Sequence, residues 1–401
     1  MKNYPRLYSE IISEHLSRYR QMVFLSGPRQ VGKTTLARER PAEYISWDRE
    51  NDRRLILAGA EKIAEKVGVS ELIRERRQLV VFDEIHRYQR WKTFLKGFFD
   101  TYEKQVHVIA TGSARMDVYK RGGDSMMGRY FPYRVHPFSV AEILAPTIPD
   151  ESLVRSPSPI EESEWKALTV FGGFPEPFAM RDRRFSRKWQ DLRLEQLLKT
   201  DVRDVSRTLE LDRIDVLARM LMNRSGSQLV YSSLARDLNV TEPTVKQWIS
   251  VLKSLYFGFE IRPWFKNVEN SLRKTPKWYL RDWATITDAG SRAETFVACH
   301  LLKAVEGWTD LGFGDFELYY LRDKQKREVD FLIARDKEPW FLVEVKKNNE
   351  RLVDALSLFQ RQTGAKHAFQ VVLDDDYVNR DCFEYETPVI VPARTFLSQL
   401  I

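Results

Sequence analysis

Residues 27–34 read Gly27-Pro28-Arg29-Gln30-Val31-Gly32-Lys33-Thr34, the pattern G-x-x-x-x-G-K-T. The apolar segment 21–26 precedes this stretch and predicts a strand, and residues 35–40 after it have the pattern of a helix opening. A glycine-rich turn between a strand and a helix directs backbone N–H groups towards an anion, so the stretch predicts a phosphate-binding loop. We expect Lys33 to reach the β- and γ-phosphates and Thr34 to bind Mg²⁺, with Thr35 completing the nucleotide-binding residues.

A second predicted strand ends in two carboxylates. Its apolar residues, 79–82, are followed directly by Asp83 and Glu84. We expect Asp83 to hold the magnesium ion and Glu84 to polarise the water that attacks the γ-phosphate. The alternative is that the glycines serve only a tight turn and that the two acids cap a structural helix. Together the two motifs predict ATP and Mg²⁺ as cofactors and ATP hydrolysis as the reaction.

A third apolar strand, predicted over 106–110, ends in Thr111-Gly112-Ser113. A hydroxyl at this point can sense the γ-phosphate, and Thr111 and Ser113 compete for that catalytic role. Either residue also suits the N-terminal cap of a following helix, which is the structural alternative.

Composition is that of an ordinary globular protein with two or three domains, since the 401 residues are 43% hydrophobic and 30% charged. No apolar run approaches the roughly 20 residues that span a bilayer, and we expect no signal peptide and no membrane partner. Cys299 and Cys382 are too few and too far apart for a metal cluster, which favours a reducing, cytoplasmic location. The excess of 64 basic over 57 acidic residues permits nucleic-acid binding without requiring it.

Periodicity divides the chain into four predicted segments. Strands and helices alternate through 1–145, the pattern of a parallel sheet wrapped by helices and hence of the ATPase domain. Prolines and serines then break the periodicity, which predicts an exposed connector over 146–163. Helical patterning dominates 164–265, and 266–401 is predicted to form a separate α/β domain.

Residues 231–259 have the pattern of a helix-turn-helix followed by a strand, as in a winged helix. Ser232 or Ser233 is expected to cap the first helix. Thr241 is expected to cap the second helix, with Pro243 in its first turn.

The second of these helices is the candidate DNA-binding element. Its apolar residues follow a 3.6-residue period and face a core, which leaves Thr244, Lys246 and Gln247 outward. These side chains are able to contact base edges or phosphates. The alternative is a winged helix that only packs against its neighbours.

Two strands near the C-terminus carry charges on one face. Because side chains of a strand alternate between faces, Glu328 and Asp330 share one face of the first strand, and Glu344 and Lys346 share one face of the next. The opposite faces are expected to point inward through the apolar residues Val329, Phe331, Ile333, Phe341, Val343 and Val345. Two carboxylates and a lysine are therefore expected to converge on adjacent strands.

These residue types suit metal-assisted phosphodiester hydrolysis. The carboxylates of Asp330 and Glu344, with the backbone carbonyl of Val345, can hold Mg²⁺, while Lys346 orients or activates the water. The arrangement resembles the PD-(D/E)XK nuclease superfamily. The resemblance implies a restriction-endonuclease-like fold, and for resolvase-like members an additional metal-binding acid on an upstream helix, where this chain has Glu294. The alternatives are a charged strand end without a site and a nuclease fold without activity.

The order of these features along nearly the whole chain resembles a widespread group of prokaryotic AAA+ ATPases. The two nucleotide motifs come first, and Gly172-Gly173-Phe174-Pro175-Glu176, the winged helix and Glu328-Val329-Asp330-Phe331 follow. The resemblance implies an AAA+ core joined to winged-helix and nuclease-like parts, in a branch that includes signal-transducing switch ATPases. It also implies a catalytic arginine, for which Arg129 is the candidate in cis or in trans. The alternative is a surface arginine beside a turn.

Two functions are consistent with these features. The first is an ATP-dependent machine that binds and processes DNA through the winged helix and a metal-dependent nuclease domain. The second is a regulatory switch in which the ATP state controls partner binding and the C-terminal domain is a scaffold. DNA is the expected partner, and a homo-oligomer is compatible with both. The nuclease is favoured if four polar residues converge within the reach of one metal ion, namely Glu294, Asp330, Glu344 and Lys346.

Overall fold

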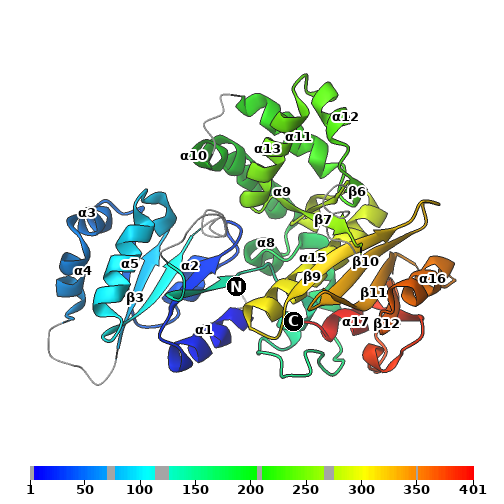
Figure 1. The fold of residues 1–401 in the computed structure, drawn as a ribbon, viewed down its shortest axis with the longest axis horizontal. Helices are drawn as coiled ribbons and strands as arrows, with labels where there is room; N and C mark the ends of the chain where they lie inside the picture. The colour runs from blue at the N-terminus through cyan, green and yellow to red at the C-terminus, as the bar shows by residue number, and fades with distance from the viewer. Residues whose placement is uncertain (1–3, 70–76, 113–125, 206–209, 266–274, 349–350) are drawn as a thin grey trace. The chain divides into compact units, whose positions relative to one another are not determined.

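The computed structural model describes residues 4–69, 77–112, 126–205, 210–265, 275–348 and 351–401 (Figure 1). The described chain forms two compact units that divide between His136 and Pro137. The N-terminal unit begins at Pro5, and Tyr4 belongs with the C-terminal unit. This division reflects how the described chain packs. It does not test the predicted boundaries at 145, 163 and 265, which stay predictions.

The N-terminal unit is built on a five-stranded sheet in the order β2-β3-β4-β1-β5, in which every pair of neighbours is parallel. The strands are β1 (Met22–Ser26), β2 (Glu43–Ser46), β3 (Gln78–Asp83), β4 (Val106–Thr111) and β5 (Tyr130–Arg134). The central strands are almost wholly buried apolar runs, as expected for a parallel sheet that is covered on both faces. The predicted parallel sheet is confirmed.

Helices precede and connect the strands of this unit. They are α1 (Leu7–Arg18), α2 (Lys33–Arg38), α3 (Glu50–Ala58), α4 (Ala60–Val67), a short 3₁₀ turn η1 (Ile85–Arg87) and α5 (Trp91–Tyr102). One apolar cluster joins α3, α4 and α5 to alternate residues of the sheet, among them Phe24, Phe82 and Val108. The neighbouring residues Val23, Val81 and Ile109, which point to the other face of the sheet, are also buried. Helix α2 lies against β4.

The strand order determines where the nucleotide motifs meet. β4 lies between β1 and β3, and all three strands run in the same direction. The loop that follows β1, the acids that end β3 and the threonine that ends β4 therefore come to the same edge of the sheet, where open parallel sheets bind ligands.

The C-terminal unit contains an eight-stranded mixed sheet in the order β13-β12-β11-β10-β9-β7-β8-β6. Its strands are β6 (Ser227–Gln228), β7 (Gly258–Pro263), β8 (Lys277–Leu280), β9 (Phe316–Arg322), β10 (Glu328–Arg335), β11 (Glu338–Lys346), β12 (His367–Val372) and β13 (Val389–Pro392). β7 pairs in parallel with β9, and β8 pairs antiparallel with β7. Residues on both sides of the predicted boundary at 265 thus contribute strands to one sheet.

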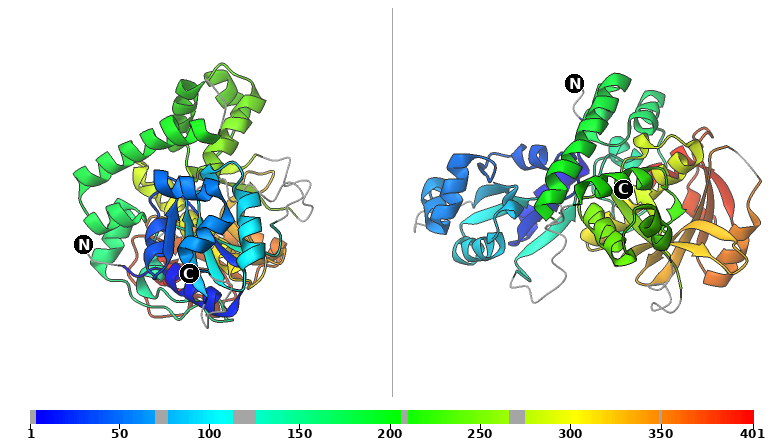
Figure 2. Two further views of the ribbon diagram at one scale, coloured as in Figure 1. Left: turned by 90° about the vertical axis from the view of Figure 1, so that its left-hand side faces the viewer. Right: turned by 90° about the horizontal axis from the view of Figure 1, so that it is seen from above.

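Helices precede and surround this sheet. They are α6 (Val140–Leu144), α7 (Glu162–Phe171), α8 (Pro175–Met180), α9 (Arg183–Gln196), a π-helical turn η3 (Leu197–Asp201), α10 (Val202–Val205), α11 (Leu211–Met222), α12 (Tyr231–Asp237), α13 (Glu242–Ser254), α15 (Ala289–Asp310), α16 (Asp354–Thr363) and α17 (Ala393–Ser398), with 3₁₀ turns η4 (Trp283–Thr285) and η5 (Cys382–Glu384). Figure 2 shows α9 in green as part of one long helical run. The long helix α15 lies against β9, β10 and β11, and α16 lies against β10, β11 and β12.

The predicted alternation in β10 is wrong at one point. Val329 packs in the same apolar cluster as Leu332, against α16, rather than with residues of its own parity. A shift of register between these two residues explains the difference, because such an irregularity breaks the two-residue period of a strand. Phe331 and Ile333 are fully buried as predicted.

Two helices, α12 and α13, lie at the positions predicted for the helix-turn-helix. The predicted cap of the second helix is confirmed, since the Thr241 hydroxyl accepts the Thr244 N–H. The predicted cap of the first helix is wrong. α12 begins at Tyr231, before both serines, and Val230 at its N-terminal cap position supplies no side-chain hydrogen bond.

The predicted connector is not an exposed linker. Leu153 and Ile160 are buried, with 1% and 7% of their surface exposed. The carbonyl of Arg155 accepts a hydrogen bond from the side chain of Gln399, and the Arg155 N–H donates to the Gln399 carbonyl. The proline-rich stretch therefore packs against the C-terminal unit in an irregular conformation.

None of the helices described has an apolar stretch long enough to cross a membrane.

Candidate functional site

The loop between β1 and α2 has the backbone that its glycines predict. Gly27 adopts a φ of 145°, and a Cβ at this position would lie 2.4 Å from the carbonyl oxygen of Val135. Gly32, directly before α2, adopts a left-handed φ of 101°. Both positions require glycine, the first for a close approach and the second for its conformation. The sequence thus folds locally into a tight loop that leads into α2.

Lys33 lies inside this loop. Its side chain is buried, and its ammonium donates hydrogen bonds to the carbonyls of Gly27, at 2.9 Å, and Pro28, at 2.8 Å. A fixed positive charge at this point can neutralise phosphate oxygens. The remaining predicted nucleotide-binding residues also lie in the loop or in the first turn of α2, namely Arg29, Gln30, Val31 and Thr35.

Asp83 is the acceptor at which three strands and α2 meet. The hydroxyl of Thr34 donates to its Oδ1 at 3.2 Å, and the hydroxyl of Thr111 donates to the same oxygen at 2.5 Å. The hydroxyl of Tyr44, from β2, donates to Oδ2. A hydroxyl and a carboxylate this close are suitable joint ligands of one hard cation. The donor set formed by Thr34 and Asp83 therefore fits Mg²⁺.

Glu84 is held at the end of β3 by a left-handed turn with a φ of 54°. Its N–H donates to the hydroxyl of Thr111 at 3.3 Å. Burial raises the pKa of its carboxyl, and the nearby ammonium of Lys33 opposes that rise. Arg87 is also close, with its Nε 3.8 Å from Oε2 of Glu84. A carboxylate with a raised pKa is a stronger proton acceptor, which suits a group that polarises water.

Of the two candidate sensors, Thr111 is the one the structure describes. It connects the acidic pair, because its hydroxyl contacts the side chain of Asp83 and the backbone of Glu84. Thr111 is fully buried at the end of β4. Ser113 lies outside the described residues.

Tyr44 was missed by the sequence analysis. Its ring lies under the guanidinium of Arg38, 4.2 Å from the ring centroid, and its hydroxyl bonds Asp83. Burial, and then the contact with the Asp83 carboxylate, raise the pKa of this hydroxyl, so Tyr44 is a donor at neutral pH. No local signal marks this tyrosine, since its role follows from β2 lying beside β3.

Arg129 does not lie at the nucleotide-binding edge of its own sheet. Its carbonyl accepts the Met22 N–H at the start of β1, whereas the phosphate-binding loop follows the other end of that strand. The strand spans on the order of 13 Å. The guanidinium is bound to Asp100 of α5 through Nε, at 2.6 Å, and Nη2, at 3.0 Å. A role in cis does not fit this position, and a role in trans stays a prediction.

The predicted C-terminal residues do come together. Oε2 of Glu344 accepts the Asp330 N–H at 3.4 Å, and Oδ2 of Asp330 accepts the Val345 N–H at 2.9 Å. The ammonium of Lys346 lies 3.0 Å from Oε1 of Glu344. Glu294 joins this group from α15, and burial first and the charge of Asp330 second raise the pKa of both Glu294 and Glu344.

Lys277, which the sequence analysis missed, lies among these carboxylates. Its ammonium is 3.1 Å from Oε1 of Glu294, 2.5 Å from Oε1 of Glu328 and 3.5 Å from Oδ1 of Asp330. Only 4% of the residue is exposed. Burial lowers the pKa of Lys277, but the three carboxylates outweigh burial and raise it, so the side chain is a cation.

This cation decides the fit of a metal ion. Lys277 and Lys346 already neutralise the carboxylates that the metal hypothesis requires, and a divalent ion would have to displace an ammonium. Throughout the described part of the chain, no group of three or more histidine, cysteine or acidic residues is arranged to hold a metal. In this arrangement Asp330 and Glu344 do not fit the metal role predicted for them.

The three residues of the candidate DNA-binding face lie on α13. Lys246 and Gln247 are exposed, and the ammonium of Lys246 lies 5.1 Å from the ring centroid of Tyr231. Thr244 is only partly exposed, and its hydroxyl is 2.9 Å from that of Thr241. The capping contact explains why Thr244 points less freely outward than predicted.

The two cysteines are free thiols. Cys382 is buried and Cys299 is partly buried, and neither forms a disulfide. Burial raises the pKa of both thiols to about 12, so they stay protonated at neutral pH.

Three parts of the chain match protein families. Residues 19–144 match the family described as AAA domain. Residues 162–290 match domain of unknown function DUF8612, and residues 289–392 match domain of unknown function DUF4143.

Relatives of the chain are themselves uncharacterised proteins. Protein Rv2008c of Mycobacterium tuberculosis and protein Mb2031c of Mycobacterium bovis are each 24% identical over 332 residues, which cover 80% of this chain and 69% of the relative. Protein MJ1637 of Methanocaldococcus jannaschii is 26% identical over 317 residues, covering 69% and 65%.

Solved structures give a weaker likeness. The ORC1 protein of Aeropyrum pernix, in complex with DNA, is 14% identical over 73% of this chain and 90% of that chain, with a TM-score of 0.31. DnaA of Aquifex aeolicus bound to AMPPCP is 16% identical over 62% and 87%, with a TM-score of 0.28. The family match, the parallel sheet and the loop geometry agree that residues 19–144 have the character of an AAA-type ATPase domain.

Proposed function

We propose that this protein binds and hydrolyses ATP at the edge of the parallel sheet. The observation that carries the proposal is the contact between Thr34 and Asp83, 3.2 Å from hydroxyl to carboxylate, beside the buried ammonium of Lys33. A hydroxyl, a carboxylate and a fixed cation at the end of a glycine loop are the groups that an ATP-magnesium complex requires.

Each residue has a separate task in this proposal. Lys33 neutralises the β- and γ-phosphates, and Thr34 and Asp83 would hold Mg²⁺. The ion, when bound, supplies charge neutralisation at the phosphates. Glu84 accepts a hydrogen bond from the attacking water and polarises it. Thr111 and Tyr44 keep the acidic pair in position through their hydrogen bonds.

Two substitutions test the assignment. Lys33→Ala should abolish the magnesium-dependent binding of ATP at the loop in isothermal titration, because the cation inside the loop is lost. Glu84→Gln should keep ATP binding and lose hydrolysis, because the amide is nearly isosteric but a poor proton acceptor. Unchanged magnesium-dependent ATP affinity in Lys33→Ala would refute the proposal.

We infer further that ATP controls a DNA-binding C-terminal region that acts as a switch or scaffold. The observation that favours this alternative over metal-dependent cleavage is the cation of Lys277 among the carboxylates of Glu294, Glu328 and Asp330. DNA binding through α13 and a homo-oligomer that uses Arg129 in trans both remain compatible with this version.

Cleavage and switching are separated by one assay. Purified protein with ATP and Mn²⁺ is incubated with linear, single-stranded and four-way-junction DNA. The switch proposal predicts intact DNA in all three cases, together with DNA binding that changes between ATP and ADP. Cleavage that is lost in Asp330→Ala, Glu344→Ala and Lys346→Ala, with ATP hydrolysis retained, would establish the nuclease instead.

A further inference from the structure

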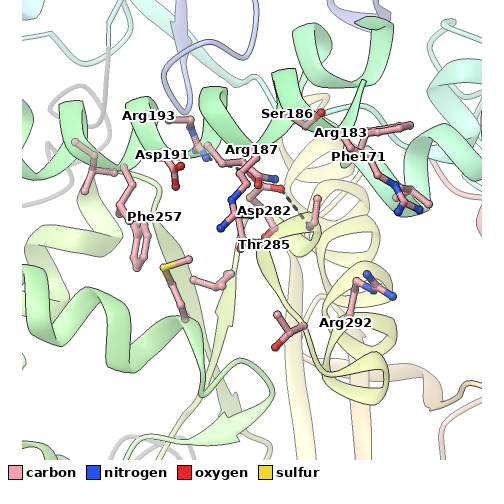
Figure 3. A pocket seen from close by; sticks show the side chains of 18 residues that line it. Phe171, Arg183, Ser186, Arg187, Asp191, Arg193, Phe257, Asp282, Thr285 and Arg292 are labelled. Atoms are coloured by element: carbon pink, nitrogen blue, oxygen red, sulfur yellow. Dashed lines mark hydrogen bonds and ion pairs between the residues drawn. The ribbon is translucent and has the colours of Figure 1, made fainter. Parts of the chain in front are cut away.

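A cavity of about 610 Å³ lies in the C-terminal unit (Figure 3). The residues that line it are separate from the carboxylate cluster, which is formed by Glu294, Glu328 and Asp330 around Lys277, with Glu344 beside Asp330. Its walls come from the end of α7, from α9, from Met222 of α11, and from the residues around η4 and the start of α15. Sites for small molecules in proteins typically have volumes of roughly 300–1,000 Å³. The cavity is therefore large enough for a ligand well beyond an inorganic ion.

Three arginines give the cavity a cationic rim. Arg183 and Arg187 project from α9 and, at a spacing of four residues, lie on one side of that helix. Arg292 contributes from the first turn of α15. In the described part of the chain none of these three guanidiniums forms an ion pair. Their donors are thus available to a ligand.

The fourth arginine of the wall has a different role. Arg193 lies 3.7 Å from Oδ2 of Asp282, and its guanidinium stacks 3.9 Å from the ring centroid of Phe174. Asp282 also accepts the Ala284 N–H at the start of η4. This pair is a fixed part of the wall. With Asp191 as the only other acid in the lining, the four arginines leave a formal excess of two positive charges.

The remaining wall is apolar. It includes two aromatic rings, Phe171 and Phe257, which Figure 3 shows among the lining side chains. The aliphatic part comprises Val170, Leu194, Leu197, Met222 and Leu280. A site with a cationic rim and an apolar, partly aromatic wall suits a ligand that has both a phosphate and a flat ring.

We propose that this cavity is a second nucleotide-type site, which takes a nucleoside phosphate either free or at the 5′ end of a DNA strand. Arg183, Arg187 and Arg292 bind the phosphate, because guanidiniums recognise phosphate oxygens in pairs of hydrogen bonds. The base lies against the apolar wall. The site differs from the loop at Lys33, to which, in the proposed function, a nucleotide would bind through backbone N–H groups and magnesium.

The test uses the full chain with Lys33→Ala, so that the loop site is removed. Binding of AMP, ATP and a 5′-phosphorylated oligonucleotide is measured by titration without divalent ions. We expect one site per chain, weakened by about tenfold to a hundredfold in Arg187→Glu, as for loss of a charge-assisted hydrogen bond. Arg183→Glu should behave in the same way, which keeps the test valid if one variant folds poorly.

Arg184→Glu is the matched control. It makes the same change of charge on α9, at an exposed position that does not line the cavity, and should leave affinity unchanged. Binding of AMP and ATP identifies a free nucleotide, whereas binding of the oligonucleotide alone identifies a strand end. Absence of binding by all three, binding of an acidic peptide instead, or equal affinity in Arg187→Glu overturns the proposal. If the loop binds no nucleotide, the wild type shows the same single site as Lys33→Ala, so failure of the proposed function is recognised separately.

Discussion

The ammonium of Lys277 lies 3.1 Å from Oε1 of Glu294, and this contact joins strand β8 to helix α15. Glu328 and Asp330 of β10 contact the same nitrogen, so one buried cation separates three carboxylates that would otherwise repel one another. The convergence expected of a metal site therefore exists, but a side chain of the protein supplies the positive charge. We therefore expect the stability of the C-terminal unit to depend on Lys277.

Replacing Lys277 should leave the surrounding carboxylates without their shared cation. Lys277→Ala should lower the free energy of unfolding by about 3–5 kcal/mol, because it leaves buried charges unpaired. Added Mn²⁺ should recover part of the loss in the variant, since the cluster then lacks a cation. Thermal and urea unfolding with and without Mn²⁺ measure both effects.

The exposed Lys324 provides the control, and Lys324→Ala should leave stability unchanged and insensitive to Mn²⁺. If the wild type is stabilised by Mn²⁺ as strongly as Lys277→Ala, a metal ion coexists with the lysine. The metal role of Asp330 and Glu344 would then be restored.

Thr111 should affect the rate of hydrolysis rather than nucleotide binding. Thr111→Val keeps the shape of the side chain but removes the bonds to Asp83 and to the Glu84 N–H. We expect kcat to fall by about tenfold to a hundredfold, the range for losing hydrogen bonds to a charged group, with ATP affinity in the absence of magnesium nearly constant. Thr111→Ser retains the hydroxyl and should recover most of the rate. An unchanged kcat in Thr111→Val would show that the acidic pair is positioned without this residue.

Local pattern predicted the geometry of the glycine-rich loop, while its role in nucleotide binding stays a prediction. Gly27, Gly32 and Lys33 are set by a contiguous motif whose backbone is determined by nearby residues, and the acids that end β3 follow an unmistakable apolar run. The start of α13 could also be predicted from the sequence, because Thr241 lies three residues before Thr244, whose N–H its hydroxyl accepts.

Side chains that reach a site only because of the order of the strands could not be predicted from the sequence. Tyr44 reaches Asp83 only because β2 pairs with β3, and Lys277 reaches β10 and α15 only through the order of the eight-stranded sheet. Neither residue has a local signal, since pairing between distant strands is not encoded in periodicity. Arg129 failed as a group acting in cis for the same reason, because the register of β5 with β1 puts it at the wrong end of the sheet.

Lys246 tests whether α13 contacts DNA. If it does, Lys246→Ala should weaken binding to all sequences and reduce the slope of log affinity against log salt by about one unit, as expected for one lost phosphate contact. Lys253→Ala is a control on the same helix, because Lys253 is already paired with Glu260. Binding curves at several salt concentrations measure the slope, and identical slopes for the wild type and Lys246→Ala would contradict the contact.

His300 should make the C-terminal unit sensitive to acid. Its Nδ1 lies 2.8 Å from the Phe296 carbonyl, and its Nε2 accepts the Val140 N–H at 3.2 Å, so both nitrogens are bonded in the neutral ring. Burial lowers the pKa of His300 to about 3 from an ordinary value of 6.5. Between these values the unfolded chain binds a proton that the folded chain does not, so stability falls as the pH drops below 6.5 and is unaffected above it.

The size of this effect is measurable against a variant. Other groups titrate in the same range, but their contribution is shared with His300→Gln, whose amide does not ionise. As the pH falls from 6 to 4.5, the unfolding free energy of the wild type should therefore decrease relative to that of the variant by about 1 kcal/mol per pH unit. This slope is close to the limit for one proton. Denaturant unfolding at intervals of half a pH unit measures it. Parallel curves for the two proteins would mean that folded His300 takes up its proton near pH 6.5, which the bond from the Val140 N–H would not permit.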